Sequence, residues 1–249
     1  MKIKLTLLFS VFALLTYAQE EIVPEKRVTL GLKFAANASL FTKTVAPFDG
    51  ARDRQFEHYQ SDYRGTGSGG VTARLDLKKG FSLDAEVLFS PRGMAFKESN
   101  QRVITVDDEG NESFAFNNYN YNIDYIELPV MVNYKFQQVG KDSYVSGYVG
   151  FAPGTVVNRK TKIRYEEARN GERSKGRYET FSLNIVRPFN TNIIGGVQLE
   201  GKPENKLVLY GDLRFNYTLM PVFDRDTNAE GRNLNTHMIT ASLGFGFRF

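Results

Sequence analysis

The sequence predicts an all-β protein: an eight-stranded antiparallel transmembrane β-barrel with long external hairpin loops and short periplasmic turns. Three observations lead to this prediction. Eight segments alternate apolar and polar residues, the connections between them alternate long and short, and no amphipathic helix is present to cover the apolar rows. Strict alternation marks a strand with two unlike faces. In an outer-membrane barrel the apolar face meets lipid and the polar face lines the lumen.

The last segment, Met238–Phe249, shows this alternation without a break. Its apolar row ends in Phe245, Phe247 and Phe249, and small or polar residues separate them. A soluble domain is not expected to place its strongest apolar face at a chain end that frays. A terminal aromatic strand also resembles the signal that the bacterial barrel-assembly machinery reads. These three phenylalanines are therefore a candidate assembly signal.

The composition narrows the class of protein. The chain has 249 residues, with 20 Phe, 13 Tyr and 22 Gly, which favours strands and tight turns. It contains no Cys, which excludes a disulfide scaffold, a Cys-based zinc site and a lipoprotein anchor. After the N-terminal region no apolar run reaches about 18 residues, so no transmembrane helix is expected. A membrane barrel remains compatible with this pattern, because its strands give a weak hydropathy signal.

Residues 1–18 are predicted to be a secretory signal peptide, which leaves residues 19–249 as one outer-membrane β-barrel domain. Lys2 and Lys4 form the charged region, Leu5–Leu15 is the apolar core, and a small-x-small cleavage site follows. The core is too short for a permanent helical anchor. Removing the two lysines lowers the formal charge from +4 to +2. This balance implies no nucleic-acid partner.

Each predicted strand carries one apolar row and one smaller or polar row. Pro129 interrupts the fourth strand, and because a closed barrel has no edge, a local bulge is expected there. In chain order the strands are Val28–Ser39, Val71–Leu77, Phe81–Phe89, Ile126–Phe136, Tyr144–Thr155, Asn192–Glu200, Leu207–Leu219 and Met238–Phe249.

The connections alternate in length. Long excursions cover about residues 40–70, 91–120 and 156–190, a medium loop covers 221–235, and the turns between them are short. The second excursion holds an acidic turn, and the third is centred on Asn-Gly, a strong hairpin signal. Both are expected to form hairpins that extend beyond the apolar band. Outer-membrane barrels show this arrangement, with short periplasmic turns and longer external loops. The structural rival is a soluble lipocalin-like barrel, which would need a cover for its outward Leu and Phe rows.

Three motifs resemble those of one family. Tyr125–Tyr134 reads Tyr-Ile-Glu-Leu-Pro-Val-Met-Val-Asn-Tyr and resembles a strand of the PorT-like outer-membrane β-barrel proteins of Bacteroidetes. Gly31–Asn37 and the closing Ser242–Phe249 are similar to segments of the same family. The resemblance covers the whole mature chain and implies an eight-stranded barrel in the outer membrane of a Gram-negative cell. The family's namesake takes part in a secretion system linked to gliding motility and cell-surface export.

The polar rows place charged residues at membrane depth. An eight-stranded barrel has an interior just wide enough for its own side chains, so these charges must be paired. The favoured interpretation is a structural network of salt bridges that fills the lumen. The alternatives are a narrow gated pore and an acid–base pair such as Asp84 with Glu86. The predicted network comprises Lys33, Arg74, Asp76, Asp84, Glu86, Glu127, Asp212, Arg214 and Arg248.

No catalytic, metal-binding or cofactor-binding residue is predicted. The two histidines, His58 and His237, are both expected on the external side, so a rim-site enzyme is conceivable, but no nucleophile motif accompanies them. They are too few for a metal site. The run from Asp107 to Glu109 could hold a hard cation weakly, although a solvated loop tip is the simpler interpretation.

The external loops are the remaining candidates for function. In residues 156–190, nine cationic residues stand against four glutamates, a net charge of +5 that could meet anionic lipid-linked sugars or an acidic partner. A soluble, charged hairpin tip is the plainer interpretation. The first loop is rich in aromatics, which could cover the barrel mouth or form a recognition surface; they are Phe41, Phe48, Phe56, Tyr59 and Tyr63.

The sequence therefore predicts a non-enzymatic outer-membrane protein with a structural or binding role at the cell envelope through its external loops. Its expected partners are outer-membrane lipid, the barrel-assembly machinery during biogenesis, and an envelope or cell-surface protein. The alternatives are an accessory role in a PorT-type secretion system, a narrow pore and a rim-site enzyme.

Overall fold

A computed structural model describes residues 28–42, 59–106, 109–139, 143–169, 172–183, 186–201, 207–223 and 236–249. The predicted export signal, residues 1–18, lies outside these ranges. Within them no helix is long and apolar enough to cross a membrane. The eleven strands of the described chain form one sheet, in which every pairing is antiparallel.

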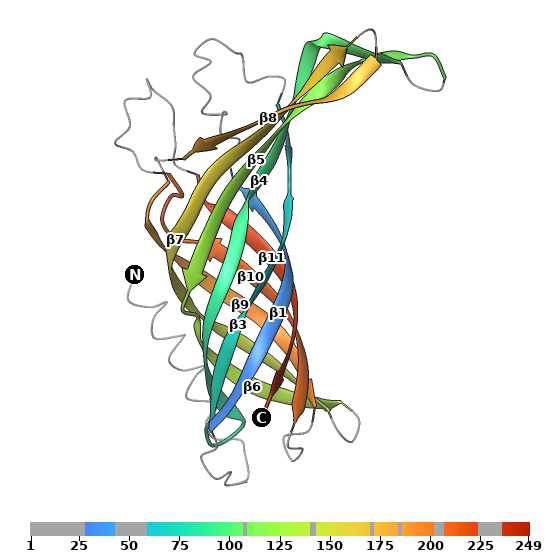
Figure 1. Cartoon of the computed structure of the whole chain (residues 1–249). Coiled ribbons are helices and arrows are strands. Elements are labelled where there is room, and N and C mark those ends of the chain that lie inside the picture. The colour runs from blue at the N-terminus through green and yellow to red at the C-terminus, as the bar shows by residue number, and fades with distance from the viewer. Residues whose placement is uncertain are drawn as a thin grey trace, which may run out of the picture.

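The sheet closes on itself as a ring of eight strand positions (Figure 1). The order around the ring is β1, β3, β4, β5 continued by β6, β7, β9, β10 and β11, and β11 pairs back with β1. β2 pairs with β4, and β8 pairs with β7, outside the ring. The predicted eight-stranded antiparallel barrel is therefore confirmed. The strands are β1 Val28–Phe41, β2 Tyr59–Asp62, β3 Arg64–Asp76, β4 Phe81–Val106, β5 Glu112–Glu127, β6 Val130–Val139, β7 Ser143–Arg169, β8 Glu172–Ser182, β9 Phe189–Gly201, β10 Val208–Thr218 and β11 Met238–Arg248.

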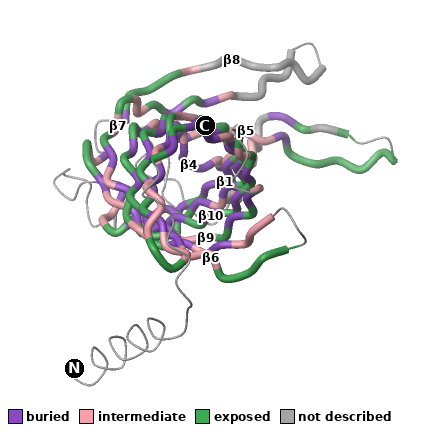
Figure 2. The backbone as a smooth tube through the Cα atoms, turned by 90° about the horizontal axis from the view of Figure 1, so that it is seen from below, coloured by how far each residue is buried: buried purple, intermediate pink, exposed green. Residues whose placement is uncertain are grey.

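Buried and exposed residues alternate along the ring strands (Figure 2). The polar residues are buried and the apolar residues are exposed, which is the reverse of the pattern in a soluble protein. On β1 and β10 the apolar rows point outward and the polar rows are buried in the lumen. On the last strand Leu243 is 68% exposed and Phe245 is 64% exposed, whereas Arg248 is 6% exposed. Soluble monomers rarely expose continuous apolar rows of this size to water. The barrel therefore has the inside-out arrangement of a membrane-spanning one.

The two ends of the barrel differ. At one end β3 turns directly into β4 through Lys79 and Gly80, whose φ angles of 60° and 76° allow the tight turn. At the other end the β4–β5 and β7–β8 hairpins project beyond the ring (Figure 1). Val106 pairs with Glu112 near the tip of the first hairpin, and β7 pairs with β8 out to Arg169. Both predicted hairpins are confirmed, and their external location stays a prediction.

The first predicted loop is shorter than expected. Residues up to Gly70 were expected to lie outside the barrel, but β3 begins at Arg64, and Gly65 to Gly70 pair with β1. The glycine-rich composition is explained by close backbone contact: a Cβ at Gly70 would lie 1.9 Å from the Val87 carbonyl oxygen of β4. Glycine is needed here because a side chain would clash with the neighbouring strand, so the glycine run does not mark a loop.

The bulge predicted at Pro129 is absent. Glu127 at the end of β5 pairs with Leu88 of β4, and Val130 at the start of β6 pairs with Ala85 of β4, so the register runs past Pro129 without a shift. The Pro129 carbonyl accepts a hydrogen bond from the Glu86 amide at 2.9 Å. The proline thus lacks a backbone hydrogen-bond donor but does not disturb the pairing of the strands. Register shifts on this part of the sheet occur instead between Asp124 and Tyr125 and between Lys135 and Gln137.

Candidate functional site

The lumen contains charged layers built from the inward rows of the strands. The central layer joins β1, β4, β7 and β10. Arg214 donates two hydrogen bonds to Glu86, at 2.7 and 2.9 Å. Lys33 Nζ lies 2.8 Å from Asp212 and 3.5 Å from Glu86. The Tyr148 hydroxyl donates to Asp212 at 2.7 Å and accepts from Arg214 Nε at 3.2 Å. Each charge of this layer contacts an opposite charge, as a buried ion requires.

A second layer, nearer the short turns, is centred on Glu200 of β9. Its carboxylate contacts Arg74, lies 3.1 Å from Arg248 and lies 2.6 Å from Lys135. Arg74 also donates to both oxygens of Asp84, at 2.5 and 2.7 Å. Such two-pronged contacts between arginine and carboxylate are the strongest hydrogen bonds that side chains make.

A third layer lies toward the long hairpins. Arg92 of β4 donates to Glu127 of β5 at 2.5 Å and to the Ser90 hydroxyl at 3.0 Å. Asn192 of β9 donates to the other oxygen of Glu127 at 2.6 Å. Glu127 is 1% exposed, so its charge is held entirely by these neighbours.

Two of the ion pairs cross the full width of the barrel. Arg214 on β10 and Glu86 on β4 have three ring strands between them in either direction, and so do Arg74 on β3 and Glu200 on β9. The interior of an eight-stranded barrel is narrow enough for side chains to span it. Protein therefore bridges the lumen at two levels.

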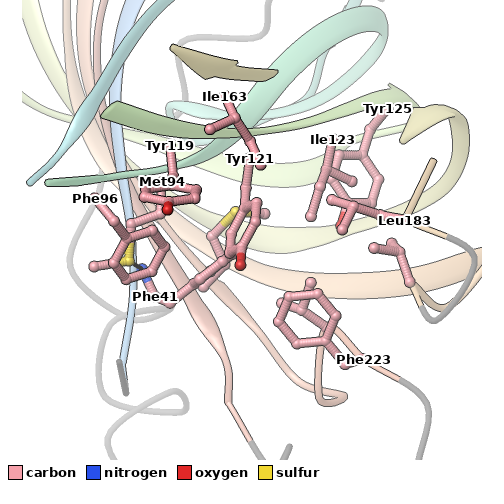
Figure 3. Close-up of a cluster of buried hydrophobic side chains, with 13 residues drawn as sticks. Phe41, Met94, Phe96, Tyr119, Tyr121, Ile123, Tyr125, Ile163, Leu183 and Phe223 are labelled. Carbon is pink, nitrogen blue, oxygen red and sulfur yellow. Dashed lines mark hydrogen bonds between the residues drawn. The ribbon is translucent and has the colours of Figure 1, made fainter. Parts of the chain in front are cut away.

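Above the third layer the lumen becomes apolar. Inward residues of β4 and β5 pack against segments at the barrel mouth and form the cap cluster (Figure 3). The Tyr121 ring centroid lies 5.2 Å from that of Phe96 and 6.1 Å from that of Phe41, and Phe41 packs edge-on against Phe223 at 5.4 Å. The cap cluster comprises Phe41, Met94, Phe96, Tyr119, Tyr121, Ile123, Tyr125, Ile163, Leu183, Val186, Val222, Phe223 and Met238.

Lumen-facing glycines leave space for tyrosine rings. A Cβ at Gly246 would lie 2.5 Å from a ring carbon of Tyr210, and a Cβ at Gly196 would lie 2.6 Å from a ring carbon of Tyr148. Both distances are far inside van der Waals contact. The small residues between the final phenylalanines therefore have a packing function: they let aromatic side chains lie flat across the lumen wall.

The structure brings most of the predicted charged residues together. Lys33, Glu86, Asp212 and Arg214 meet in the central layer, Arg74, Asp84 and Arg248 in the second, and Glu127 in the third. Asp76 is half-buried at the short-turn end of β3.

Six members of these layers are not among the predicted charged residues, and two of them, Ser90 and Asn192, are neutral hydrogen-bond partners. Glu200 and Lys135 lie on the inward rows of predicted strands, so the alternation could have identified them. Tyr148 also lies on an inward row, but its aromatic ring did not suggest a polar contact. The sequence predicts that Arg92 lies in the second long excursion, because nothing in it marks how far β4 extends beyond Phe89.

Of the two histidines proposed for a rim-site enzyme, His237 lies within the described residues. His237 Nδ1 lies 2.8 Å from the Thr218 carbonyl oxygen, which can only accept, and its ring stacks on Tyr217 at 5.3 Å. His58 lies outside the described residues, as do Asp107 and Asp108 of the acidic turn. In the described ranges, no group of three or more His, Asp or Glu side chains could hold a metal ion.

The aromatic residues predicted for the first loop lie in different environments. Phe41 is buried in the cap cluster, whereas Tyr63 is 64% exposed. Phe48 and Phe56 lie outside the described residues, and Tyr59 begins β2.

The described part of the β4–β5 hairpin carries exposed apolar side chains beyond the ring of the barrel. Ile104, Val106 and Phe114 are 58%, 62% and 47% exposed, and Ile104 pairs with Phe114 across the hairpin. This group is called the hairpin patch below. At the opposite end of the barrel, Phe245 and Phe249 of the predicted assembly signal are exposed on the outward row, with Phe247 half-exposed between them.

Comparisons with known proteins agree on one class. A family model described as "Outer membrane protein beta-barrel domain" matches residues 17–224. No curated protein matches the sequence.

Several solved structures resemble the chain at low identity. The attachment invasion locus protein Ail of Yersinia pestis is 13% identical, with a TM-score of 0.37, over 91% of this chain and 100% of that one. The outer membrane protein OprG of Pseudomonas aeruginosa is 9% identical, with a TM-score of 0.45, over 90% and 97%. Neisserial surface protein A is 10% identical, with a TM-score of 0.35, over 90% and 98%.

Proposed function

The chain belongs to the outer membrane protein beta-barrel domain family, and we propose that this outer-membrane protein is a closed, non-enzymatic barrel that presents binding hairpins to the outside. The short turns then face the periplasm and the long hairpins face the exterior, as in other barrels of this class. The barrel itself acts as a rigid membrane anchor, and the external hairpins bind the partner.

The observation that supports a closed barrel is the cross-bracing of the lumen. Arg214–Glu86 and Arg74–Glu200 span the barrel from wall to wall, and the cap cluster fills its external end. A conducting pore would need solvated charges along a continuous path, whereas these charges are 2% to 7% exposed and neutralise one another. We therefore assign the charged layers a structural function, which is to hold the wall strands in register.

The binding function is supported by the hairpin patch. Ile104, Val106 and Phe114 lie on the part of the β4–β5 hairpin that extends past the lipid-facing rows, so lipid cannot cover them. Exposed apolar groups on a soluble surface often mark a site of protein contact. A stiff two-stranded ribbon with such a group near its tip is suited to an envelope or cell-surface partner.

Conductance recordings in planar bilayers test the closed barrel. Purified protein that shows the boiled-versus-unboiled gel shift of a folded barrel is expected to produce no unitary current steps, while an open porin in the same membrane conducts. Regular steps that scale with the amount of folded protein would contradict the proposal.

Labelling of intact cells tests the presentation of the hairpins. The native chain has no Cys, so a single Val106→Cys variant reports one position. A membrane-impermeant maleimide is expected to label this variant on intact cells and to leave a Lys79→Cys variant, at the periplasmic turn, unlabelled until the cells are broken. The reverse pattern would show that the barrel is inserted the other way.

An accessory role in a PorT-type secretion system is the second candidate. It is supported by the motif at Tyr125–Tyr134. However, the structure gives the motif residues structural contacts: Tyr125 is in the cap cluster and Glu127 binds Arg92. Deletion of the gene followed by assay of surface-protein export tests this candidate. Normal export in the deletion strain would remove it.

A further inference from the structure

We propose that a row of cationic side chains on the outward face of β7 binds the phosphate groups of an anionic glycolipid in the outer leaflet. The row consists of Lys160, Lys162 and Arg164 and is called the basic stripe. This inference depends on the barrel standing in the outer membrane. It does not depend on a closed lumen or on a partner for the hairpin patch.

The basic stripe faces away from the barrel axis. Thr161 and Ile163 are 3% and 1% exposed and point inward, and Ile163 belongs to the cap cluster. The residues that alternate with them, Lys160 and Lys162, are exposed, and Arg164 is half-exposed. Successive positions on one face of a strand are about 7 Å apart, so the stripe is an evenly spaced row of positive charge.

The stripe begins at the height of the lipid headgroups. On β7 the last exposed apolar residue of the lipid-facing row is Val157, at 50% exposure. Val157 is the extra residue of a bulge opposite Asp124 and Tyr125, and Lys160 lies two ladder positions beyond it, about 7 Å along the strand at roughly 3.3 Å per residue. With a strand tilt of about 40°, this places its Cα about 5 Å above the apolar band. Long cationic side chains at this depth reach the interface readily.

Polar residues of the neighbouring strands border the stripe. Across the β5–β7 ladder, the half-buried Asn120 and Asn118 pair with Lys162 and Arg164, and the buried Asn122 pairs with Lys160. On the other side, Ser182 and Thr180 of β8 pair with the two lysines and are exposed. Amides and hydroxyls beside cations suit a phosphorylated sugar, because they can bond its hydroxyl groups while the cations bind phosphate.

Two described acidic residues near Lys160 and Lys162 lie away from them. Asp124 lies below the stripe on β5 and accepts a hydrogen bond from Asn158 at 2.7 Å. Glu179 of β8 pairs with Ile163, so its side chain lies on the opposite face of the sheet. Lys160 and Lys162, both exposed, therefore place positive charge directly above the lipid rows. That charge favours an anionic headgroup as the ligand.

The test compares folded protein variants in nanodiscs made of phosphatidylcholine with or without diphosphorylated lipid A. Retained lipid A is measured by native mass spectrometry, and affinity is measured by titration at low and high salt. The variant is Lys160→Gln with Lys162→Gln. The matched control is Lys78→Gln with Lys79→Gln, which removes the same charge from exposed positions at the periplasmic turn. All proteins must show the boiled-versus-unboiled gel shift.

Wild-type protein and the control are expected to bind lipid A, and the stripe variant is expected to bind it about 30-fold more weakly, from the typical contribution of two lysines near an anionic surface. Binding should also weaken with added salt. Dephosphorylated lipid A is expected to bind as weakly to wild type as phosphorylated lipid A binds to the variant, and millimolar inorganic phosphate should not compete. Equal affinity of variant and wild type would overturn the proposal, as would equal affinity for dephosphorylated lipid A. Binding of an acidic peptide in place of lipid A would overturn it in favour of a protein partner.

Discussion

Replacing Glu86 with glutamine should destabilise the barrel more than any comparable surface change. Glu86 accepts two hydrogen bonds from Arg214 and lies 3.5 Å from Lys33. In the variant both cations share the single carboxylate of Asp212, at 2.8 Å from Lys33 and 3.6 Å from Arg214. The central layer then carries an uncompensated positive charge. Removing one partner of a buried ion pair costs about 3–5 kcal/mol, and because glutamine keeps the shape and one acceptor, the lower end applies.

Equilibrium unfolding in urea measures this loss. The chain has no Trp, so far-UV circular dichroism and the gel shift report the folded fraction of protein in detergent micelles or lipid vesicles. With a slope of about 2–3 kcal/mol per molar urea, a loss of about 3 kcal/mol moves the midpoint down by roughly 1 M or more. Glu112→Gln is the matched control, since Glu112 is exposed on the external hairpin. The free energy of unfolding of this control should stay within about 0.5 kcal/mol of the wild-type value.

A rescue variant separates loss of charge pairing from loss of packing. Glu86→Met combined with Arg214→Met removes both members of the pair and leaves Lys33 with Asp212. The double variant should be less destabilised than the sum of its two single variants, because neither charge is left alone. Strict additivity, or a Glu86→Gln midpoint equal to that of wild type, would refute the reasoning, since either result means that water solvates these groups in the lumen.

Three further changes test other parts of the structure. Gly246→Ala places a methyl group 2.5 Å from the Tyr210 ring and should cost about 1–3 kcal/mol by the same urea assay, whereas Gly211→Ala on the lipid side has no neighbour nearer than 3.7 Å and should cost little. Leu243→Arg, midway along β11, should cost about 2–4 kcal/mol in lipid vesicles, while Val106→Arg beyond the membrane should not. Phe249→Ser should lower the amount of protein assembled in the outer membrane severalfold without changing the midpoint of refolded protein, as expected for a signal read during assembly.

Strand positions and faces could be predicted because they follow from period-two alternation, which is a local property. The apolar row that ends at Phe245 and Phe249 already shows which side meets lipid. The Asn-Gly pair at the centre of the third excursion likewise indicated a hairpin, and β7 and β8 form it. These features depend only on neighbours in the sequence.

The pairing inside the lumen could not be predicted, because it depends on the stagger between strands far apart in the chain. Arg214 meets Glu86 because their strands stand opposite each other in the ring, which no spacing in the sequence reveals. Two predictions based on glycine and proline were also wrong. The run from Gly65 to Gly70 suggested a loop but pairs with β1, and Pro129 suggested a bulge but keeps the register. In both cases the neighbouring strands decide the local conformation.

Cysteine labelling at two adjacent positions tests the central claim, which is that polar rows fill a closed lumen and apolar rows face lipid. Ser242 is 8% exposed and Leu243 is 68% exposed on the same strand, and the chain has no native Cys. A lipid-soluble maleimide should label Leu243→Cys in the membrane, and a bulky water-soluble maleimide should label neither variant until the barrel is unfolded. Rapid labelling of Ser242→Cys by the water-soluble reagent would show an open lumen, and labelling of Leu243→Cys by the same reagent would show that the apolar face does not contact lipid.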